Sequence, residues 1–283
     1  MVSYNVENLF HPERDSINTD SLFTPDGERR WTYTRYYRKV ENIARVLTVI
    51  GEWEGVDMAG LQEVESEACV KRLCYTLRRD EYDYIHYDSP DKRGIDVALI
   101  YKKERFVPVS SASLTVPLGD HTTRDILYVC GQRKPEGDTL HVFVCHLPSR
   151  LSGAAESEWK RLAARQVLQQ AVDSVLALQP GASVIVMGDM NSSPKEDIRG
   201  LRNRMIPFQR KGEGTHKWQG QWTCLDQFYT TPDLDSAQVR IFAPGWIQET
   251  DEQGLGLKPM RCYVGFRYQN GFSDHLPVLL TLF

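Results

Sequence analysis

The stretch "VIVMGDMNSSP", residues 184–194, runs from branched apolar residues directly into Gly-Asp-Met-Asn and stops at a proline. The apolar run is typical of a buried strand that finishes in a turn. A carboxylate, Asp189, and an amide, Asn191, therefore follow the open end of a predicted strand, where a scaffold presents polar groups to a cleft. Taken alone, the same pattern also fits a turn or a helix cap before Pro194.

Similar apolar runs recur along the whole chain and predict strands at 2–6, 56–64, 95–101, 126–132, 140–147, 183–190, 224–231, 238–243 and 277–283. Amphipathic helices are predicted between them. One has an apolar stripe from Tyr37 to Ile50, one covers about 66–79 with Ser66 as N-cap, and one covers about 154–178. The core-facing stripe of the last one includes Trp159, Leu162, Leu168, Val175 and Leu178.

Many strands with few, well-separated helices predict an α/β fold in which two packed mixed β-sheets are flanked by helices. The near-continuous apolar runs indicate that both sheets are buried on both faces. The chain has 283 residues, of which 41% are hydrophobic, and it contains no long linker rich in Pro, Gly or Ser. Residues 1–283 are therefore expected to form a single domain.

The overall charge and the cysteines exclude some functions. A net charge of -4 gives no global basic excess to hold a polyanion, which argues against a general nucleic-acid binder. The six cysteines have no CxxC spacing and are expected to be small buried hydrophobes rather than zinc ligands. Without an apolar span or an N-terminal signal pattern, we expect a cytoplasmic monomer, with export left open if a leader has been removed.

Polar residues interrupt other predicted strands at their ends. Glu63 in "LQEVES" and His146 in "VCHLPSR" follow apolar runs, whereas Asp274 and His275 in "GFSDHLPV" precede theirs. If that last strand is antiparallel to the others, its beginning lies where they finish. Together with Asn5 and Glu7 of "SYNVENL", these segments would converge on one rim.

The chemistry of this set favours phosphate-ester hydrolysis. Carboxylates with few histidines and no paired cysteines suit Mg²⁺ or Mn²⁺ rather than zinc. A hydrated divalent ion with histidines and an asparagine can stabilise the charge that develops on a phosphoryl group. Asp189 would handle the attacking water, and Asn191 would hold the phosphate or the same water. Each residue also has a structural alternative: His146 as a core histidine, Glu63 as an aid to helix entry.

With these residues identified, the sequence resembles the endonuclease/exonuclease/phosphatase superfamily. The matching motifs are "SYNVENLF", "LQEVES", "RGIDVALIY", "VCHLPSR", "VMGDMNSSP", "LDQFYTT" and "GFSDHLPV", which follow the family's order over residues 3–282. The resemblance implies a four-layer α/β sandwich and a Mg²⁺-dependent phosphoesterase. It also implies Glu63 as the principal metal ligand, with Glu7 and Asp274 as further ligands.

The same resemblance assigns roles to the other positions. Asp189 and Asn191 match residues that activate water and bind the scissile phosphate. His275 matches the catalytic histidine, and Asp226 matches the carboxylate that orients it. His146 matches a histidine that stabilises or protonates the leaving oxygen. Asn5, Arg93 and Arg150 are expected to contact the substrate phosphate, the arginines by bidentate contact unless they are ordinary surface residues.

Departures from the pattern bear on the substrate. Abasic-site endonucleases have tyrosine where this chain has His146, so the sequence leans away from that branch. Cys145 stands where many relatives have asparagine. Long basic or aromatic insertions that would grip duplex DNA are missing, so a small phosphorylated substrate is favoured over nucleic acid. Residues 249–275 are expected to form a rim loop, in which Tyr263, Phe266 and Tyr268 line a pocket or simply pack.

Three functions remain open at this point. The favoured one is a Mg²⁺- or Mn²⁺-dependent phosphodiesterase or phosphatase. The alternative is a non-specific or structure-specific nuclease. A non-catalytic binding module is less favoured, because every position that the chemistry needs carries a competent residue.

Overall fold

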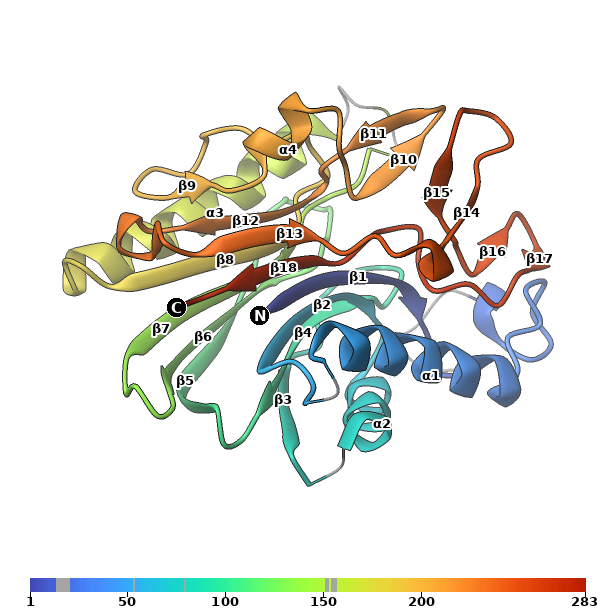
Figure 1. Ribbon diagram of the computed structural model, residues 1–283, viewed down its shortest axis with the longest axis horizontal. Coiled ribbons are helices and arrows are strands. Elements are labelled where there is room, and N and C mark those ends of the chain that lie inside the picture. Colours follow the sequence, from blue (N-terminus) through green and yellow to red (C-terminus); the bar gives the residue numbers. More distant parts are fainter. Residues whose placement is uncertain (14–20, 53, 79, 151–152, 154–156) are drawn as a thin grey trace.

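Two six-stranded β-sheets form the centre of the molecule (Figure 1). The computed structural model describes residues 1–283 except 14–20, 53, 79, 151–152 and 154–156. The first sheet has the order β13 (Gln238–Ile241), β18 (Val278–Thr281), β1 (Val2–Leu9), β2 (Met58–Val64), β4 (Asp96–Lys102), β3 (Tyr82–His86). The second has the order β5 (Phe106–Leu114), β6 (Ile126–Arg133), β7 (Thr139–His146), β8 (Ser183–Asp189), β12 (Asp226–Thr230), β9 (Arg202–Asn203).

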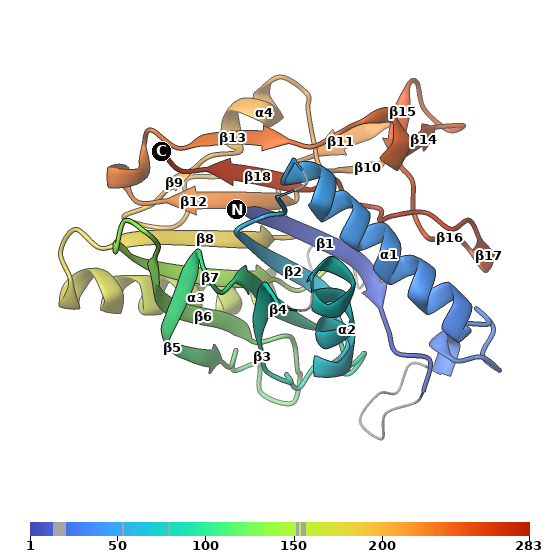
Figure 2. The ribbon, with the colours of Figure 1, turned by 60° about the horizontal axis from the view of Figure 1, so that its bottom comes forward.

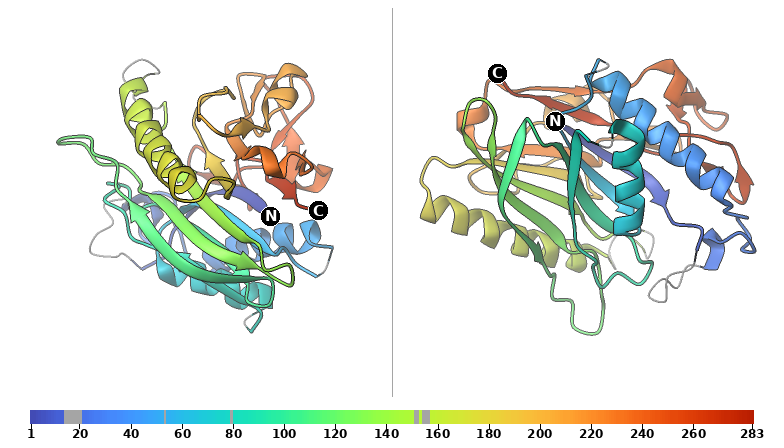
Figure 3. Two further views of the ribbon diagram at one scale, coloured as in Figure 1. Left: turned by 90° about the vertical axis from the view of Figure 1, so that its left-hand side faces the viewer. Right: turned by 90° about the horizontal axis from the view of Figure 1, so that it is seen from below.

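Both sheets are mixed. β1 pairs with β2 in parallel, as does β7 with β8, whereas β18 pairs with β1 in the antiparallel sense. The condition stated for the last strand, that it runs antiparallel to its neighbours, is therefore met by β18. The two ends of the chain lie close together, since the Met1 amino group donates to the Leu280 carbonyl at 2.8 Å (Figure 3).

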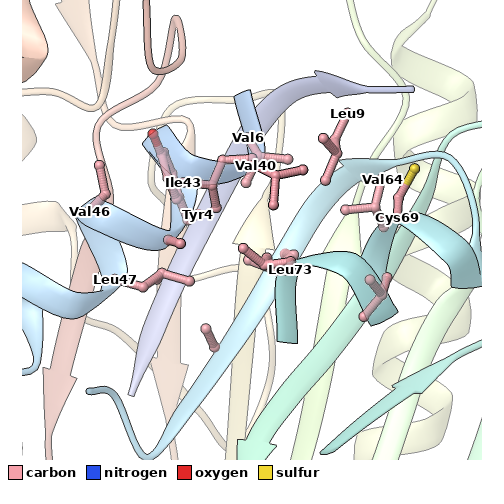
Figure 4. Close-up of a cluster of buried hydrophobic side chains, with 14 of the residues drawn as sticks. Tyr4, Val6, Leu9, Val40, Ile43, Val46, Leu47, Val64, Cys69 and Leu73 are labelled. Carbon is pink, nitrogen blue, oxygen red and sulfur yellow. The ribbon is translucent and has the colours of Figure 1, made fainter. Parts of the chain in front are cut away.

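Helices cover the outer faces of both sheets and complete the four layers. α1 (Tyr33–Ile50) and α2 (Glu67–Arg78) lie over the first sheet (Figure 2), and α3 (Glu158–Leu178) lies over the second. In the outer core of the first sheet, Val40 and Ile43 of α1 pack with Leu73 of α2 against Tyr4 and Val6 of β1 (Figure 4). The predicted α/β class and the predicted layers are confirmed.

Alternation along β8 explains its continuous apolar run. Val184 and Val186 point outward to α3, while Ile185 and Met187 point inward to the core between the sheets. A strand has a side-chain period of two, so a run that is apolar at every position must be buried on both faces. The expectation that the sheets are buried on both faces is confirmed.

Some local predictions were wrong. β3 and β5 were not predicted, because "YDYIH" is short and "FVPVSSASL" is a polar edge strand that carries a proline. Tyr37, Trp159, Leu162 and Leu178, assigned to core-facing stripes, are 40%, 45%, 54% and 84% exposed. The N-terminal part of the third predicted helix, 154–156, lies outside the described residues. Ser66 lies just before α2 as expected, and its hydroxyl contacts Cys69 Sγ at 3.6 Å.

Small hairpins gather at the end of the sandwich where β1 finishes (Figure 1). They are β10–β11 (His216–Trp218 and Gln221–Thr223), β14–β15 (Gln248–Thr250 and Leu257–Pro259) and β16–β17 (Tyr263–Val264 and Arg267–Tyr268). α4 (Ile206–Arg210) and the 3₁₀ turns η1 (Ser21–Phe23), η2 (Pro232–Leu234) and η3 (Gly245–Ile247) complete the described elements. All six cysteines are free. Within the described part of the chain, no helix has the length and apolarity to cross a membrane.

Candidate active site

Strand alternation and register place the central residues of the site. His146 on β7, Asp189 on β8 and Asp226 on β12 are direct cross-strand partners and form one row across the second sheet. Each continues the inward-facing set of its strand, so the row lies between the sheets. Asn5 on β1 of the opposite sheet donates from Nδ2 to Asp189 Oδ2 at 3.1 Å. The predicted convergence of strand ends on one rim therefore holds for these segments.

Glu63 reaches the same point from β2. Its Oε2 accepts a hydrogen bond from the Asn8 backbone N–H at 2.9 Å, and its Oε1 lies 3.5 Å from Asn5 Nδ2. Glu63 has a φ of 65°, and β2 is irregular there, with a register shift between Gln62 and Val64. Left-handed backbone in residues other than glycine is costly and concentrates at functional sites. Glu7, Asn8 and Asn191 share this conformation, with φ values of 52°, 53° and 48°.

Gly188 explains how Asp189 reaches the row. Its φ is 142°, and an added Cβ would lie 1.9 Å from the Cys145 carbonyl oxygen. Only glycine lets β8 approach β7 this closely at the point where both strands end. In the stretch 184–194, Gly188 is therefore required by the backbone, and Asp189, which follows it, supplies the carboxylate of the site.

The imidazole of His275 is held by Asp226. Its Nδ1 lies 2.7 Å from Asp226 Oδ2, and its Nε2 lies 3.9 Å from Asp189 Oδ2. Burial alone would lower the pKa of His275, but the Asp226 carboxylate, with help from Asp189 and Asp274, raises it well above the ordinary value. The ring is therefore a cation at neutral pH. Its Nδ1 faces Asp226, and its Nε2 faces Asp189 in the centre of the site.

His146 has the opposite character. Burial, together with the nearby charges of Arg124, Arg93 and His275, holds its pKa well below the ordinary value, so the ring is neutral. Its Nε2 lies 3.6 Å from Asp189 Oδ2 and 3.9 Å from Glu63 Oε1, while Nδ1 is buried without a hydrogen-bond partner. A proton on Nε2 faces the carboxylates, and the bare lone pair then falls on Nδ1. This tautomer makes His146 a neutral donor.

Burial and neighbouring charges shift the pKa values of three acids of the site. Burial, with the charges of Asp226 and Glu63, raises the pKa of Asp189 to about 6, although His275 opposes this shift. Burial and the charge of Asp274 raise the pKa of Glu7 to about 7, and Lys39 opposes it. Burial also disfavours ionisation of Asp274, but the charges of His275 and Arg261 hold its pKa below the ordinary value. A divalent cation would relieve this crowding.

The donor set fits a hard cation. Glu63, Glu7 and Asp274 offer carboxylate oxygens, the ligands that Mg²⁺ and Mn²⁺ prefer. Glu7 Oε2 also accepts the Cys262 backbone N–H at 2.7 Å, and Asp274 Oδ2 accepts Arg261 Nη2 at 2.9 Å. The carboxylates of Glu7 and Asp274 are therefore each shared between the site and the segment 261–262.

Two other groups of potential ligands fit a metal less well. Ligand atoms of His216, Asp274 and His275 lie within 4.8 Å of one another, but a protonated His275 cannot bind a metal. The His216 ring is 4.9 Å from the His275 ring, and burial next to that cation lowers its pKa to about 4. The other group consists of His86, Asp88 and Asp96. It fits a metal less well because the Asp96 carboxylate already lies 3.2 Å from His86 Nε2 and accepts the Ser89 N–H at 2.9 Å.

The residues expected to contact phosphate lie around this centre. Arg93 is half-buried and donates from Nη2 to Asn8 Oδ1, next to Glu63. Arg150 is exposed and donates from Nε to the Asn191 carbonyl at 3.0 Å. The Asn191 backbone N–H donates to Asp189 Oδ1 at 2.8 Å, and its side-chain amide donates to the Leu147 carbonyl at 2.9 Å. One of the two amide N–H groups of Asn191 is therefore already engaged.

Several residues of the site were not predicted. They are Lys39, Arg124, His216, Arg261 and Ser273. Lys39 is 1% exposed, donates to the Phe272 carbonyl at 2.6 Å and lies 3.9 Å from Glu7 Oε2. A lysine between Tyr36 and Ile43 on an apolar helix face was the signal that could have revealed it. Arg124 is also buried, pairs with Asp91 at 3.1 Å and donates to the Leu147 carbonyl at 2.9 Å.

Comparison with known proteins identifies the family of the chain. The sequence profile described as "Endonuclease/Exonuclease/phosphatase family" matches residues 1–283. The chain belongs to this family. Members of the endonuclease/exonuclease/phosphatase family hydrolyse phosphate esters and generally depend on a divalent metal ion, so the chain is a phosphoric ester hydrolase. No curated protein matches the sequence.

Solved structures of the family share the fold. Mannosyl-6-phosphatase Bt3783 of Bacteroides thetaiotaomicron superposes with a TM-score of 0.62 at 15% identity, over 100% of this chain and 98% of that one. The human Nocturnin catalytic domain, solved with a bound sulfate anion, gives 0.58 at 18% identity, over 99% and 93%. TDP2 from Caenorhabditis elegans gives 0.64 at 16% identity, over 100% and 74%. At these identities the likeness concerns the fold.

Proposed function

We propose that this protein hydrolyses phosphate esters of small molecules with Mg²⁺ or Mn²⁺ as cofactor. The observation that supports this proposal best is the in-register row of His146, Asp189 and Asp226, which faces Asn5 and Glu63 across the gap between the sheets. Glu63 would hold the ion, with Glu7 and Asp274 as further ligands. When bound, the ion polarises a phosphoryl oxygen and offsets the charge of the transition state.

Asp189 orients and deprotonates the attacking water. Its Oδ1 is held by the Asn191 backbone N–H and its Oδ2 by Asn5, so the carboxylate is fixed in place. Burial and the neighbouring carboxylates raise its pKa to about 6, which makes it a stronger base than an exposed aspartate. A base with a pKa near the working pH is largely ionised and still takes up a proton readily, which is what general-base catalysis requires.

The two histidines stabilise charge on different oxygens. His275 is cationic and presents Nε2 to a phosphoryl oxygen, while Asp226 fixes the other side of its ring. His146 is neutral and offers its Nε2 proton to the leaving oxygen. Preorganised donors of this kind lower the barrier because they need no rearrangement as charge develops. Asn5, Asn191, Arg93 and Arg150 orient the phosphate.

The charge of the molecule and its rim favour a small substrate. The chain has a net charge of -4, and hairpins β10–β11, β14–β15 and β16–β17 gather at the end of the sandwich that carries the site (Figure 1). In the rim loop, Tyr263 is 4% exposed and its hydroxyl donates to the Arg29 carbonyl at 2.9 Å, so this ring packs. Phe266 is 60% exposed and remains available to line a pocket.

The proposal is tested with activated aryl phosphomonoesters and phosphodiesters. Hydrolysis should vanish with a chelator and return with Mg²⁺ or Mn²⁺, and the purified protein should then be assayed with Mn²⁺ against sugar, inositol, lipid head-group and nucleotide phosphates. Asp189→Ala and His275→Ala should each reduce kcat by more than about tenfold in folded protein. Smaller losses would contradict the assigned roles, and no Mn²⁺ binding at millimolar concentration would favour a non-catalytic module.

A nuclease is the second candidate, and one surface feature favours it. On the α1–α2 face, the Arg72 guanidinium lies 5.1 Å from the Tyr37 ring centroid and 5.4 Å from that of Tyr75, and these rings are 40% and 55% exposed. Exposed rings interleaved with arginine can stack unpaired bases. Incubation with plasmid, single-stranded DNA and RNA in the presence of Mg²⁺ decides between the candidates, because inertness toward all three would exclude the nuclease.

A further inference from the structure

Arg261 is a cation that the rim loop brings to the edge of the site. Its Nη2 donates to Asp274 Oδ2 at 2.9 Å, and Asp274 Oδ1 in turn lies 4.0 Å from His275 Nε2. The side chains of Arg261 and Asp274 are 32% and 25% exposed, so the pair faces solvent at the mouth of the site. Arg261 was not among the residues expected from the sequence.

The backbone around Arg261 is fixed on both sides. The next residue, Cys262, donates its N–H to Glu7 Oε2 at 2.7 Å, and the preceding residue, Met260, accepts the Phe272 N–H at 2.7 Å. A Cβ on Gly271 would lie 2.2 Å from the Arg261 carbonyl oxygen, so the loop is in close contact there. The loop therefore presents the Arg261 side chain from a firm base, while its guanidinium stays half-exposed.

We propose that Arg261 is a ligand for the substrate phosphate and that a divalent cation releases it from Asp274. The proposal rests on the proposed function, since Asp274 is one of the carboxylates that would bind the ion. A cation at Asp274 weakens the attraction between that carboxylate and the guanidinium, and a partly exposed ion pair is weak at the outset. The released guanidinium group of Arg261 can then donate to two oxygens of an incoming phosphate.

Without substrate, the metal ion and Arg261 compete for the carboxylate of Asp274. With substrate, both bind the phosphate group, so each should strengthen the binding of the other. Arg261→Gln should bind Mn²⁺ about 3-fold more tightly than wild type in the absence of an oxyanion, because no cation competes for Asp274. Saturating sulfate, a mimic of the phosphate group, should tighten Mn²⁺ binding in wild type and do so less in the variant. The difference in Mn²⁺ affinity between wild type and Arg261→Gln should therefore become smaller or change sign when sulfate is added.

Calorimetric Mn²⁺ titrations with and without sulfate test this inference independently of turnover. Arg267→Gln is the matched control, because Arg267 is an exposed arginine of the same loop and its loss changes the net charge equally. It should behave as wild type in both titrations. In assays, Arg261→Gln should raise KM about 10-fold, with a smaller effect in Arg261→Lys.

Other outcomes overturn the inference in distinguishable ways. Equal Mn²⁺ affinities for wild type and Arg261→Gln, with and without sulfate, would show that Arg261 neither competes with metal nor binds the anion. Weaker Mn²⁺ binding by Arg261→Gln under both conditions would make Arg261 a structural support of Asp274. A wild-type protein that binds no Mn²⁺ would refute the proposed function and this inference together.

Discussion

Asp226 Oδ2 and His275 Nδ1, separated by 49 positions in the chain, lie 2.7 Å apart, and both side chains are buried. Asp226 belongs to the second sheet, and His275 lies three positions before Val278, the first residue of β18 in the first sheet. The contact therefore ties the sheets together at the rim and sets the charge of the imidazole. Stability and chemistry depend here on the same hydrogen bond.

Replacing Asp226 with Asn should lower the pKa of His275, because the carboxylate that raises this pKa is lost while the burial that opposes it remains. NMR titration of the His275 ring in chelator should show a proton retained well above pH 6.5 in wild type and lost at lower pH in the variant. The stabilisation from the charged pair is fully present below the unfolded pKa of about 6.5 and is lost as pH rises through the folded pKa. A His275 titration that is unchanged in the variant would contradict the assignment.

Metal binding should release protons, and more at pH 6 than at pH 8. Glu7 and Asp189, with pKa values raised to about 7 and about 6, hold protons in the metal-free protein at pH 6 that a bound cation would displace. Calorimetry of Mg²⁺ or Mn²⁺ binding in buffers with different ionisation heats measures this release. Glu7→Gln should reduce it at pH 6, and a release independent of pH would count against the raised pKa values.

The same two acids should make the metal-free protein less stable as pH rises. Their pKa values are higher in the folded state than in the unfolded chain, so the native state binds more protons between about pH 4 and pH 7. Stability contributed by this protonation is present at low pH and is lost as pH rises through the folded pKa values. Urea unfolding in chelator should show this loss, and saturating Mg²⁺ should reduce it.

Lys39→Met should destabilise the fold by about 2–3 kcal/mol, because it removes a buried donor and leaves Glu7 and the Phe272 carbonyl without their cationic partner. Arg38→Met is the control, since Arg38 is exposed on the same helix and should change stability by less than about 0.5 kcal/mol. Urea unfolding measures both. Equal effects of the two changes would remove the case for Lys39 as a support of Glu7.

Gly188→Ala should damage both the fold and the site, because the new Cβ would collide with the Cys145 carbonyl oxygen. Gly137→Ala separates this clash from the cost of left-handed backbone, since Gly137 has a φ of 82° and open space around its missing Cβ. The control should lose about 1 kcal/mol, and Gly188→Ala should lose more. Thermal unfolding compares them, and similar losses would exclude the clash as the reason for glycine.

The sequence predicted the central strands because they are buried on both faces, which leaves a clear apolar run. It also placed polar groups at their ends, because a polar residue directly after such a run is conspicuous. The edge strand β5 gave no such signal, since serines and a proline dilute it. The family motifs, rather than any local pattern, supplied the pairing of Asp226 with His275.

Burial of charged residues was the part that local patterns could not predict. Arg161 is 1% exposed while its neighbour Leu162 is 54% exposed, because the guanidinium donates to the Pro148 carbonyl at 3.2 Å and to Ser157 Oγ at 2.8 Å. Tyr37 lies on the apolar side of its helix by spacing, yet it is 40% exposed, and the Arg72 guanidinium from α2 lies 5.1 Å from the centroid of its ring. Such placements depend on which loops and helices meet in space.

The Ser273 hydroxyl donates to the Asn5 carbonyl at 2.7 Å across 268 positions of sequence, and it accepts the His275 N–H at 3.0 Å. Asn5 is therefore synthesised long before Ser273 and His275. A nascent chain carries an incomplete rim until residues 273–275 have been synthesised. A polypeptide that stopped before position 273 would keep most of the described strands but would lack the imidazole of His275.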